Sequence, residues 1–312
     1  MSATFKLRLN AEEVFMRVCV VLVSLLLLSG CQSLFFWPTQ GLVNSPQEFS
    51  FEREIVLIEN TEGLKLHGWY LNARPSDSKH NGTIYILHGN ASNLSYHIAN
   101  FYWLIDHGWN VFMLDYQGFG RSEGEPTFAG IIDDALLGYN WLRDKHGENE
   151  TIVVFGQSLG GAAAIGFASK ANQAPDGLIV DSTFSSHRQI FRETLAKSWL
   201  FWSFQWPLSL PINDDYAPKK LIQQSQKIPT LIIHSQADSL ISLEHANTLY
   251  ESATAPKMLW IDDKSEHAQI WRSSTWKDRL VCQLKRWPEL RDPEKVCDSS
   301  RKNEVVFANS YL

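Results

Sequence analysis

Short apolar runs alternate with amphipathic stretches from about residue 50 onward. Strands that are buried on both faces of a sheet read as continuous apolar runs, so this alternation predicts a parallel sheet covered by helices. The predicted strands are residues 52–58, 64–71, 83–87, 110–114, 151–155, 177–180, 229–234 and 257–261.

The first two predicted strands are joined by the turn residues 60–63, which favour an antiparallel hairpin. Helical spacing predicts four helices, the second of them capped by Thr127. They cover residues 94–106, 127–145, 159–171 and 268–287. The fold class is therefore α/β, with a mostly parallel central sheet and helices on both of its faces.

The N-terminal apolar run, residues 18–28, is too short to span a bilayer well and has the length of a signal-peptide core. Arg17 precedes it, and Leu28-Ser29-Gly30-Cys31 follows it and resembles a bacterial lipoprotein cleavage site. The resemblance implies cleavage before Cys31 and lipidation of that residue. The alternative is a buried N-terminal helix or a simple membrane anchor. Translation could also start at Met16 instead of Met1.

A lipidated Cys31 predicts a membrane-anchored bacterial lipoprotein with residues 1–30 as signal peptide and 31–50 as tether. The residue after Cys31 is Gln32, whereas an Asp at this position retains enteric-type lipoproteins at the inner membrane. We therefore expect the protein at the outer membrane, facing the periplasm. The aromatic residues 35–37 lie either in the membrane interface or on the domain.

The predicted folded domain is 51–287, with 288–312 as a C-terminal tail. An oxidising periplasm permits a disulfide between Cys282 and Cys297, and the sequence leaves open whether they pair.

Composition and charge exclude several classes. The chain is 44% hydrophobic and 20% charged, which is typical of a folded globular protein. Its net charge of −6 argues against a nucleic-acid partner. No zinc-type Cys pair, other metal-ligand spacing or phosphate loop occurs, so no cofactor is expected.

Gly156-Gln157-Ser158-Leu159-Gly160 follows a predicted strand and opens a predicted helix. This is the context of a nucleophile elbow, where small flanking residues permit a tight turn that lifts the Ser hydroxyl above the sheet. We expect Ser158 to be the nucleophile and the Leu159 N–H, at a helix N-terminus, to face an oxyanion. The alternative is a glycine-rich turn without chemistry.

A second oxyanion N–H is expected from Asn90, in the loop His88-Gly89-Asn90-Ala91 after an earlier strand. We expect His88 to brace this loop rather than exchange protons.

These motifs, together with Asp115-Tyr116-Gln117-Gly118-Phe119-Gly120-Arg121-Ser122, resemble the serine hydrolases of the α/β-hydrolase fold. The similarity is greatest to the Bem46-like and serine-aminopeptidase-like (S33) branch, and it covers about residues 64–287.

The resemblance implies the order Ser, Asp, His. It places the acid at Asp238, after strand 229–234, with Asp181 as the rival. The base is placed at His267, after strand 257–261, whereas His234 and His245 are expected to be structural. Ser235 and Ala268 depart from the family's usual Gly and Asn.

A helical lid is expected at about 184–226, before the late strands, and its aromatic stretch 199–208 is the only indication of substrate. These side chains either line an acyl pocket, enter lipid headgroups or pack on the core. Arg188 and Arg192 either bind an anion or form a solvated helix face.

Three functions remain open at this point. The first is hydrolysis of carboxylic ester or thioester bonds in a small-molecule or lipid acyl substrate. The second is peptidase or acyltransferase activity on the same triad, and the third is a non-catalytic, membrane-tethered binding role.

Overall fold

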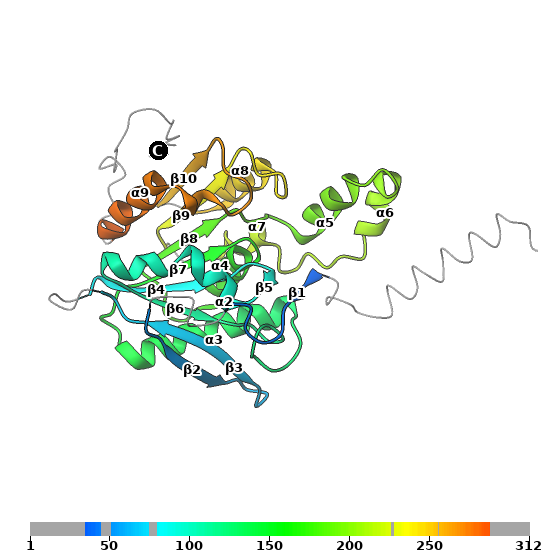
Figure 1. The fold of residues 1–312 in the computed structure, drawn as a ribbon. Helices are drawn as coiled ribbons and strands as arrows, with labels where there is room; N and C mark the ends of the chain where they lie inside the picture. The colour runs from blue at the N-terminus through cyan, green and yellow to red at the C-terminus, as the bar shows by residue number, and fades with distance from the viewer. Residues whose placement is uncertain (1–34, 45–50, 75–79, 226–227, 255, 288–312) are drawn as a thin grey trace, which may run out of the picture.

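A single eight-stranded sheet forms the centre of the protein (Figure 1). The computed structural model describes residues 35–44, 51–74, 80–225, 228–254 and 256–287. The strands lie in the order β10-β9-β8-β7-β4-β6-β3-β2. Their bounds are β2 (Glu54–Glu59), β3 (Lys65–Leu71), β4 (Gly82–Leu87), β6 (Trp109–Leu114), β7 (Ile152–Gln157), β8 (Gly177–Asp181), β9 (Thr230–Ser235) and β10 (Lys257–Asp262).

The sheet is mostly parallel, as the apolar runs predict. β10, β9, β8, β7, β4 and β6 pair in parallel, whereas β3 is antiparallel to both β6 and β2. The predicted hairpin is confirmed, and the Asn60 side chain closes its turn by accepting the Glu62 and Leu64 N–H groups. The carboxyl ends of the parallel strands therefore share one edge, where ligands bind in such sheets.

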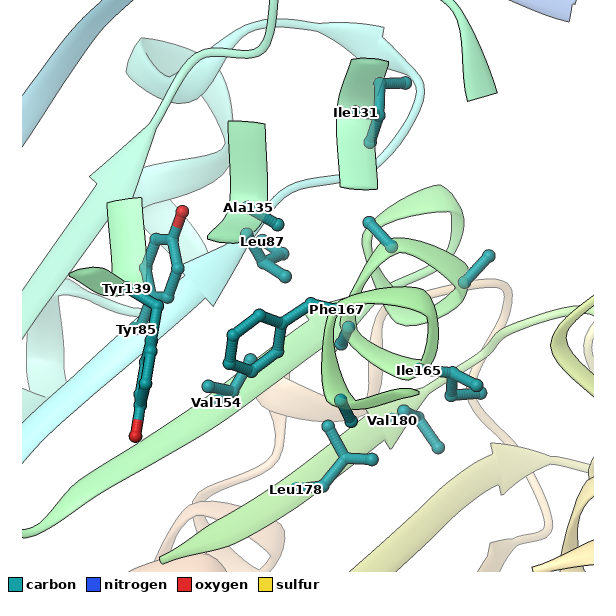
Figure 2. Packing of buried hydrophobic residues seen from close by; sticks show 14 of the residues in the cluster. Tyr85, Leu87, Ile131, Ala135, Tyr139, Val154, Ile165, Phe167, Leu178 and Val180 are labelled. Atoms are coloured by element: carbon teal, nitrogen blue, oxygen red, sulfur yellow. The ribbon is translucent and has the colours of Figure 1, made fainter. Parts of the chain in front are cut away.

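Helices cover both faces of the sheet. One face packs on α3 (Phe128–His146), α4 (Leu159–Lys170) and α8 (Leu243–Ser252). The other packs on α2 (Leu94–His97), η4 (Tyr102–His107) and α9 (Ser274–Lys285). Figure 2 shows Phe167 of α4 turned toward the sheet, among the side chains of Val154, Tyr139 and Leu178. Thr127 caps α3 as predicted, because its hydroxyl accepts the Gly130 N–H.

Two predicted helices are wrong in extent. Residues 94–106 form α2, η3 (Ile98–Asn100) and η4, because the backbone leaves helical geometry at Phe101 (φ −130°). Residues 268–287 contain η6 (Ile270–Arg272) before α9, because Ser273 is extended between the two. Both segments still bury the apolar residues that produced the helical spacing.

The insertion between β8 and β9 is a helical lid, as predicted. It contains α5 (His187–Ala196), η5 (Trp202–Phe204), α6 (Gln205–Ser209) and α7 (Pro218–Leu221). In Figure 1, α5 and α6 project away from the sheet, on the side where β1 (Trp37–Pro38) lies.

The N-terminal aromatic residues differ in their exposure. Phe36 is buried and its ring packs on Phe128, whereas Trp37 is 65% exposed. β1 pairs in parallel with β5 (Ala91–Ser92), which follows the Asn90 loop.

Several predictions concern residues outside the described ranges: the signal peptide, lipidation of Cys31, the tail and the Cys297 end of a disulfide. Cys282 itself is disulfide-bonded. Within the described ranges, no helix is both long and apolar enough to cross a membrane.

Candidate active site

Ser158 occupies a strained turn between β7 and α4. Its backbone has φ 55° and ψ −118°, a conformation that side-chain-bearing residues rarely adopt. The turn also requires glycine on either side. A Cβ on Gly156 would meet the Gly160 carbonyl oxygen, and a Cβ on Gly160 would meet the Leu87 carbonyl oxygen at the end of β4. The tight passage of α4 across the strand ends therefore explains both glycines.

Gly160→Ala is expected to lower the free energy of unfolding by about 3 kcal/mol. The added methyl group would meet the Leu87 and His88 carbonyl oxygens, which are backbone atoms and cannot move aside. The control is Gly63→Ala, where a Cβ would meet only the Glu59 carboxylate, at 4.0 Å, and the positive φ costs about 1 kcal/mol. Chemical denaturation of both variants measures the difference. Equal losses would contradict this account of the turn.

The structure brings Ser158, His267 and Asp238 together. His267 Nε2 lies 3.1 Å from Ser158 Oγ, and His267 Nδ1 lies 2.7 Å from Asp238 Oδ2. Ser158 follows β7, Asp238 follows β9, and His267 lies in the loop after β10. The three residues thus meet at the carboxyl edge of the sheet, although up to 109 positions separate them in sequence.

Asp238 is held as a carboxylate. Burial alone would raise its pKa, but the hydrogen bond from His267, the charge of His267 and the Ile241 N–H bring the pKa below its usual value. Its second oxygen accepts the Leu240 and Ile241 N–H groups at 2.9 Å. The carboxylate is therefore fixed from its own loop and presents one oxygen to His267.

The rival acid, Asp181, has different partners. Its carboxylate accepts hydrogen bonds from Gln157 Nε2, Trp271 Nε1 and the Ser182 hydroxyl at 2.8, 2.8 and 2.9 Å. Burial raises its pKa, and these three donors partly offset the shift. Asp181 thus braces the floor of the site, and it makes no hydrogen bond to His267 among the described residues.

The two expected oxyanion donors lie on adjacent elements. Leu159 N–H is at the N-terminus of α4, and Asn90 N–H is in the loop between β4 and β5. Within the described part of the chain, neither N–H donates to another protein group. The Asn90 side chain is instead used to hold the N-terminal segment: its Nδ2 donates to the Phe35 carbonyl at 2.5 Å, and its Oδ1 accepts the Trp37 N–H at 3.1 Å.

A buried polar cluster supports the Asn90 loop. His88 is fully buried, as expected of a bracing residue, and its Nδ1 lies 2.8 Å from the Gly89 carbonyl. Its Nε2 lies 3.4 Å from Asp115, whose carboxylate also accepts the Leu94 N–H at 2.7 Å. Tyr116 donates to the His88 carbonyl. The sequence analysis assigned no role to Asp115 or Tyr116.

Thr183 is a further residue that sequence reasoning missed. Its hydroxyl donates to the Ser158 carbonyl, across the start of α4. No local motif signals this contact, because Thr183 lies 25 positions away and follows a different strand.

A small apolar depression lies beside the start of α4, and its cavity volume of about 10 Å³ leaves room for a group the size of one water molecule. Leu159, Ala162 and Ala163 form one wall, and α3 residues and two lid residues, His187 and Tyr216, complete it. Burial lowers the pKa of His187 to about 4, with a partial offset from Asp214, so its ring is neutral at neutral pH. The lining is therefore suited to an uncharged group.

The remaining candidates have structural partners. His234, on β9, donates from Nε2 to the Ile241 carbonyl at 2.9 Å, and His245 hydrogen-bonds Ser185 and Glu193. Arg188 donates to the Ile212 carbonyl, and Arg192 lies 4.1 Å over the Trp206 ring. In the described ranges, no cluster of three or more His, Cys, Asp or Glu side chains could hold a metal ion.

Comparison with known proteins identifies the family. The family model for the serine aminopeptidases, S33, matches residues 78–226. The Escherichia coli K12 protein YfhR is 32% identical over 254 residues, which cover 79% of this chain and 85% of YfhR. The chain belongs to the S33 family of α/β hydrolases. This S33-type hydrolase is also 29% identical to the α/β hydrolase domain-containing protein WAV2 of Arabidopsis thaliana, over 79% of this chain and 83% of WAV2.

Solved structures support the fold of this S33-type hydrolase. The Pyrococcus furiosus esterase Pf2001 superposes with a TM-score of 0.64 and 28% identity, over 81% of this chain and 97% of the esterase. A soluble variant of the monoglyceride lipase from Saccharomyces cerevisiae, at 17% identity and a TM-score of 0.58, shares the fold over 80% of this chain and 98% of the lipase.

Proposed function

We propose that this hydrolase cleaves carboxylic ester or thioester bonds through an acyl-enzyme on Ser158. His267 Nε2 takes the Ser158 proton as Oγ attacks the acyl carbonyl carbon, and Asp238 orients and stabilises the imidazolium that forms. The Leu159 and Asn90 N–H groups stabilise the tetrahedral oxyanion. His267 then returns the proton to the departing alkoxide or thiolate, and water hydrolyses the acyl-enzyme in a second, similar step.

The observation that carries this proposal is the continuous hydrogen-bonded line from Ser158 Oγ through His267 to Asp238. Both distances, 3.1 and 2.7 Å, are within hydrogen-bond reach without any rearrangement. The two N–H groups without a protein acceptor lie close by in the fold: that of Leu159 directly after Ser158, and that of Asn90 after the neighbouring strand β4. A glycine-rich turn without chemistry would have no need of an aligned base and acid.

The substrate class follows from the pocket beside Leu159. Its walls are aliphatic and aromatic apart from a neutral imidazole and a phenol. This lining suits an acyl group in its chemistry, and movement of the lid residues His187 and Tyr216 would have to enlarge the depression before a chain could enter. We therefore propose a small-molecule or lipid acyl substrate, and no cofactor is needed for the chemistry.

Anchoring at the membrane is part of the same proposal. Cleavage before Cys31 and its lipidation would place the mature protein at the outer membrane, facing the periplasm. The described chain starts only four residues later, at Phe35. The catalytic domain would therefore remain close to the bilayer surface.

A peptidase function is the second candidate, because the matching family model is described as serine aminopeptidase. An aminopeptidase must hold a protonated amino group, for which a carboxylate is the natural partner. The residues that line the pocket include no Asp or Glu. Hydrolysis of aminoacyl anilides in preference to esters of matched size would favour this alternative.

The experiment is hydrolysis of p-nitrophenyl esters from acetate to palmitate by the wild type and by Ala163→Leu. Ala163 lines the pocket, so the larger side chain is expected to shift the chain-length optimum toward shorter acyl groups. Hydrolysis of the acetate, which does not need the pocket, is the internal control for folding and chemistry. An unchanged profile would exclude this pocket as the acyl site, and no turnover of any ester would contradict the ester-bond proposal.

A further inference from the structure

The lid carries a group of large apolar side chains that the described residues leave exposed. The lid patch consists of Trp199, Leu200, Phe201, Trp202, Phe204, Trp206 and Leu210. Trp199 is 90% exposed, and Trp202 and Trp206 are each exposed by more than 60%. Of the three alternatives for these aromatic residues, packing on the core is therefore wrong for most of the stretch. Exposed apolar groups gathered in this way mark an interaction surface.

The charge of the lid patch differs from that of the rest of the chain. Residues 194–213 contain no Asp or Glu, although the whole protein has a net charge of −6. Their one cation is Lys197, and Arg192 lies beside them with its guanidinium over the Trp206 ring. Trp and Phe with a flanking cation are typical of segments that lie in the headgroup region of a bilayer. An anionic membrane surface would not repel such a patch.

The N-terminal segment enters the domain at the base of the same lid. The Phe35 ring packs on Phe191 of α5 with a centroid separation of 5.4 Å, and Asn90 binds the Phe35 carbonyl. Phe35 comes four positions after Cys31, a span of at most about 14 Å. A lipid attached to Cys31 would therefore hold the bilayer surface near α5, next to the lid patch.

We propose that the lid patch docks on the lipid bilayer, with its Trp and Phe rings at the boundary between headgroups and acyl chains. This inference rests on the proposed anchoring at Cys31 but not on the proposed chemistry. It supplies a second attachment, and two attachments are what a stable orientation on a membrane requires.

Docking would also orient the active site. Lys197 Nζ donates to the Ser239 and Leu240 carbonyls beside Asp238, and Glu193 meets His245 at 3.2 Å. The lid is therefore joined to the loop that carries the acid. His187 and Tyr216 of the same insertion line the acyl pocket. The insertion that would dock on the bilayer therefore also forms part of the wall beside Leu159.

The test compares two exposed leucines. Leu210 in the lid patch is 67% exposed, and Leu57 on β2, away from the lid, is 66% exposed. Leu210→Cys and Leu57→Cys are each labelled with an environment-sensitive fluorophore in the full-length, membrane-purified protein. The proteins are reconstituted in vesicles of phosphatidylethanolamine and phosphatidylglycerol, with and without brominated acyl chains, and separated from unbound protein by flotation.

We expect the fluorophore at Leu210→Cys to shift to the blue and to lose emission severalfold in brominated vesicles, while Leu57→Cys does neither. Adding Trp199→Ser, Trp202→Ser and Trp206→Ser should restore emission at Leu210→Cys without releasing the protein from the vesicles. Floating protein with an unquenched Leu210→Cys would overturn the docking proposal. A blue shift that depends on protein concentration and occurs without bromine quenching would show that the lid patch contacts a second copy of the chain instead of lipid.

These experiments distinguish failure of the docking proposal from failure of the proposed ester hydrolysis. The Ser158→Ala background should leave bromine quenching unchanged, because the patch does not depend on the nucleophile. Protein that does not float with the vesicles would overturn both the anchoring and the docking, whereas ester hydrolysis in detergent would be unaffected.

Discussion

Replacing Ser158 by alanine is expected to lower kcat/KM for ester hydrolysis by about 10⁴-fold or more, as for other triad nucleophiles. The hydroxyl is the group that forms the acyl-enzyme, and among the described residues it is the one hydroxyl hydrogen-bonded to His267, with Oγ 3.1 Å from Nε2. The stability should change little, because Ser158 is held by its backbone: its N–H donates to the Asp181 carbonyl, and its own carbonyl accepts from Thr183.

Ser169→Ala is the matched control for this variant. Ser169 lies on the same helix, α4, and its hydroxyl donates only to the Gly166 carbonyl within that helix. It should retain activity close to that of the wild type. A Ser158→Ala protein that is folded by circular dichroism and still hydrolyses esters at the wild-type rate would contradict the assignment of the nucleophile.

The second large effect is expected from a comparison of the two candidate acids. Asp238→Asn should lower kcat by about 10⁴-fold while the protein stays folded, because the amide oxygen can still accept the Leu240 and Ile241 N–H groups. The amide cannot, however, stabilise the imidazolium of His267.

Asp181→Asn should instead reduce stability, since its buried carboxylate has three donors that one amide oxygen cannot satisfy. Its kcat per folded molecule should remain near that of the wild type. Steady-state kinetics and thermal unfolding on both variants separate the two effects. Loss of kcat in Asp181→Asn, together with an active Asp238→Asn, would show that Asp181 is the triad acid and that Asp238 is structural.

The fold could be predicted largely because its signals are local. Continuous apolar runs mark the buried parallel strands, and Thr127 marks the start of α3. The two helices at 94–106 and 268–287 were overextended because buried short helical turns have the same apolar spacing as one long helix. The exposure of the lid patch also could not be predicted, since an aromatic sequence does not reveal whether anything covers it.

Some residues of the candidate site could be predicted from local sequence, and others could not. Ser158 lies in a local motif, whereas Asp238 and His267 required the chain order that the family resemblance supplied. The contacts that hold the site are long-range: Thr183 to Ser158, Asn90 to Phe35, and the three donors to Asp181. Each joins residues from different elements, so tertiary structure is needed before any of them can be named.

The most direct test of the central claim is mass spectrometry of the protein after reaction with a fluorophosphonate. The account predicts one adduct, on the peptide that contains Ser158, and its loss in His267→Ala because the base no longer activates the hydroxyl. Under turnover of a p-nitrophenyl ester, rapid acid quenching should trap the acyl group on the same peptide. No adduct, or an adduct on a different residue, would contradict an acyl-enzyme at Ser158.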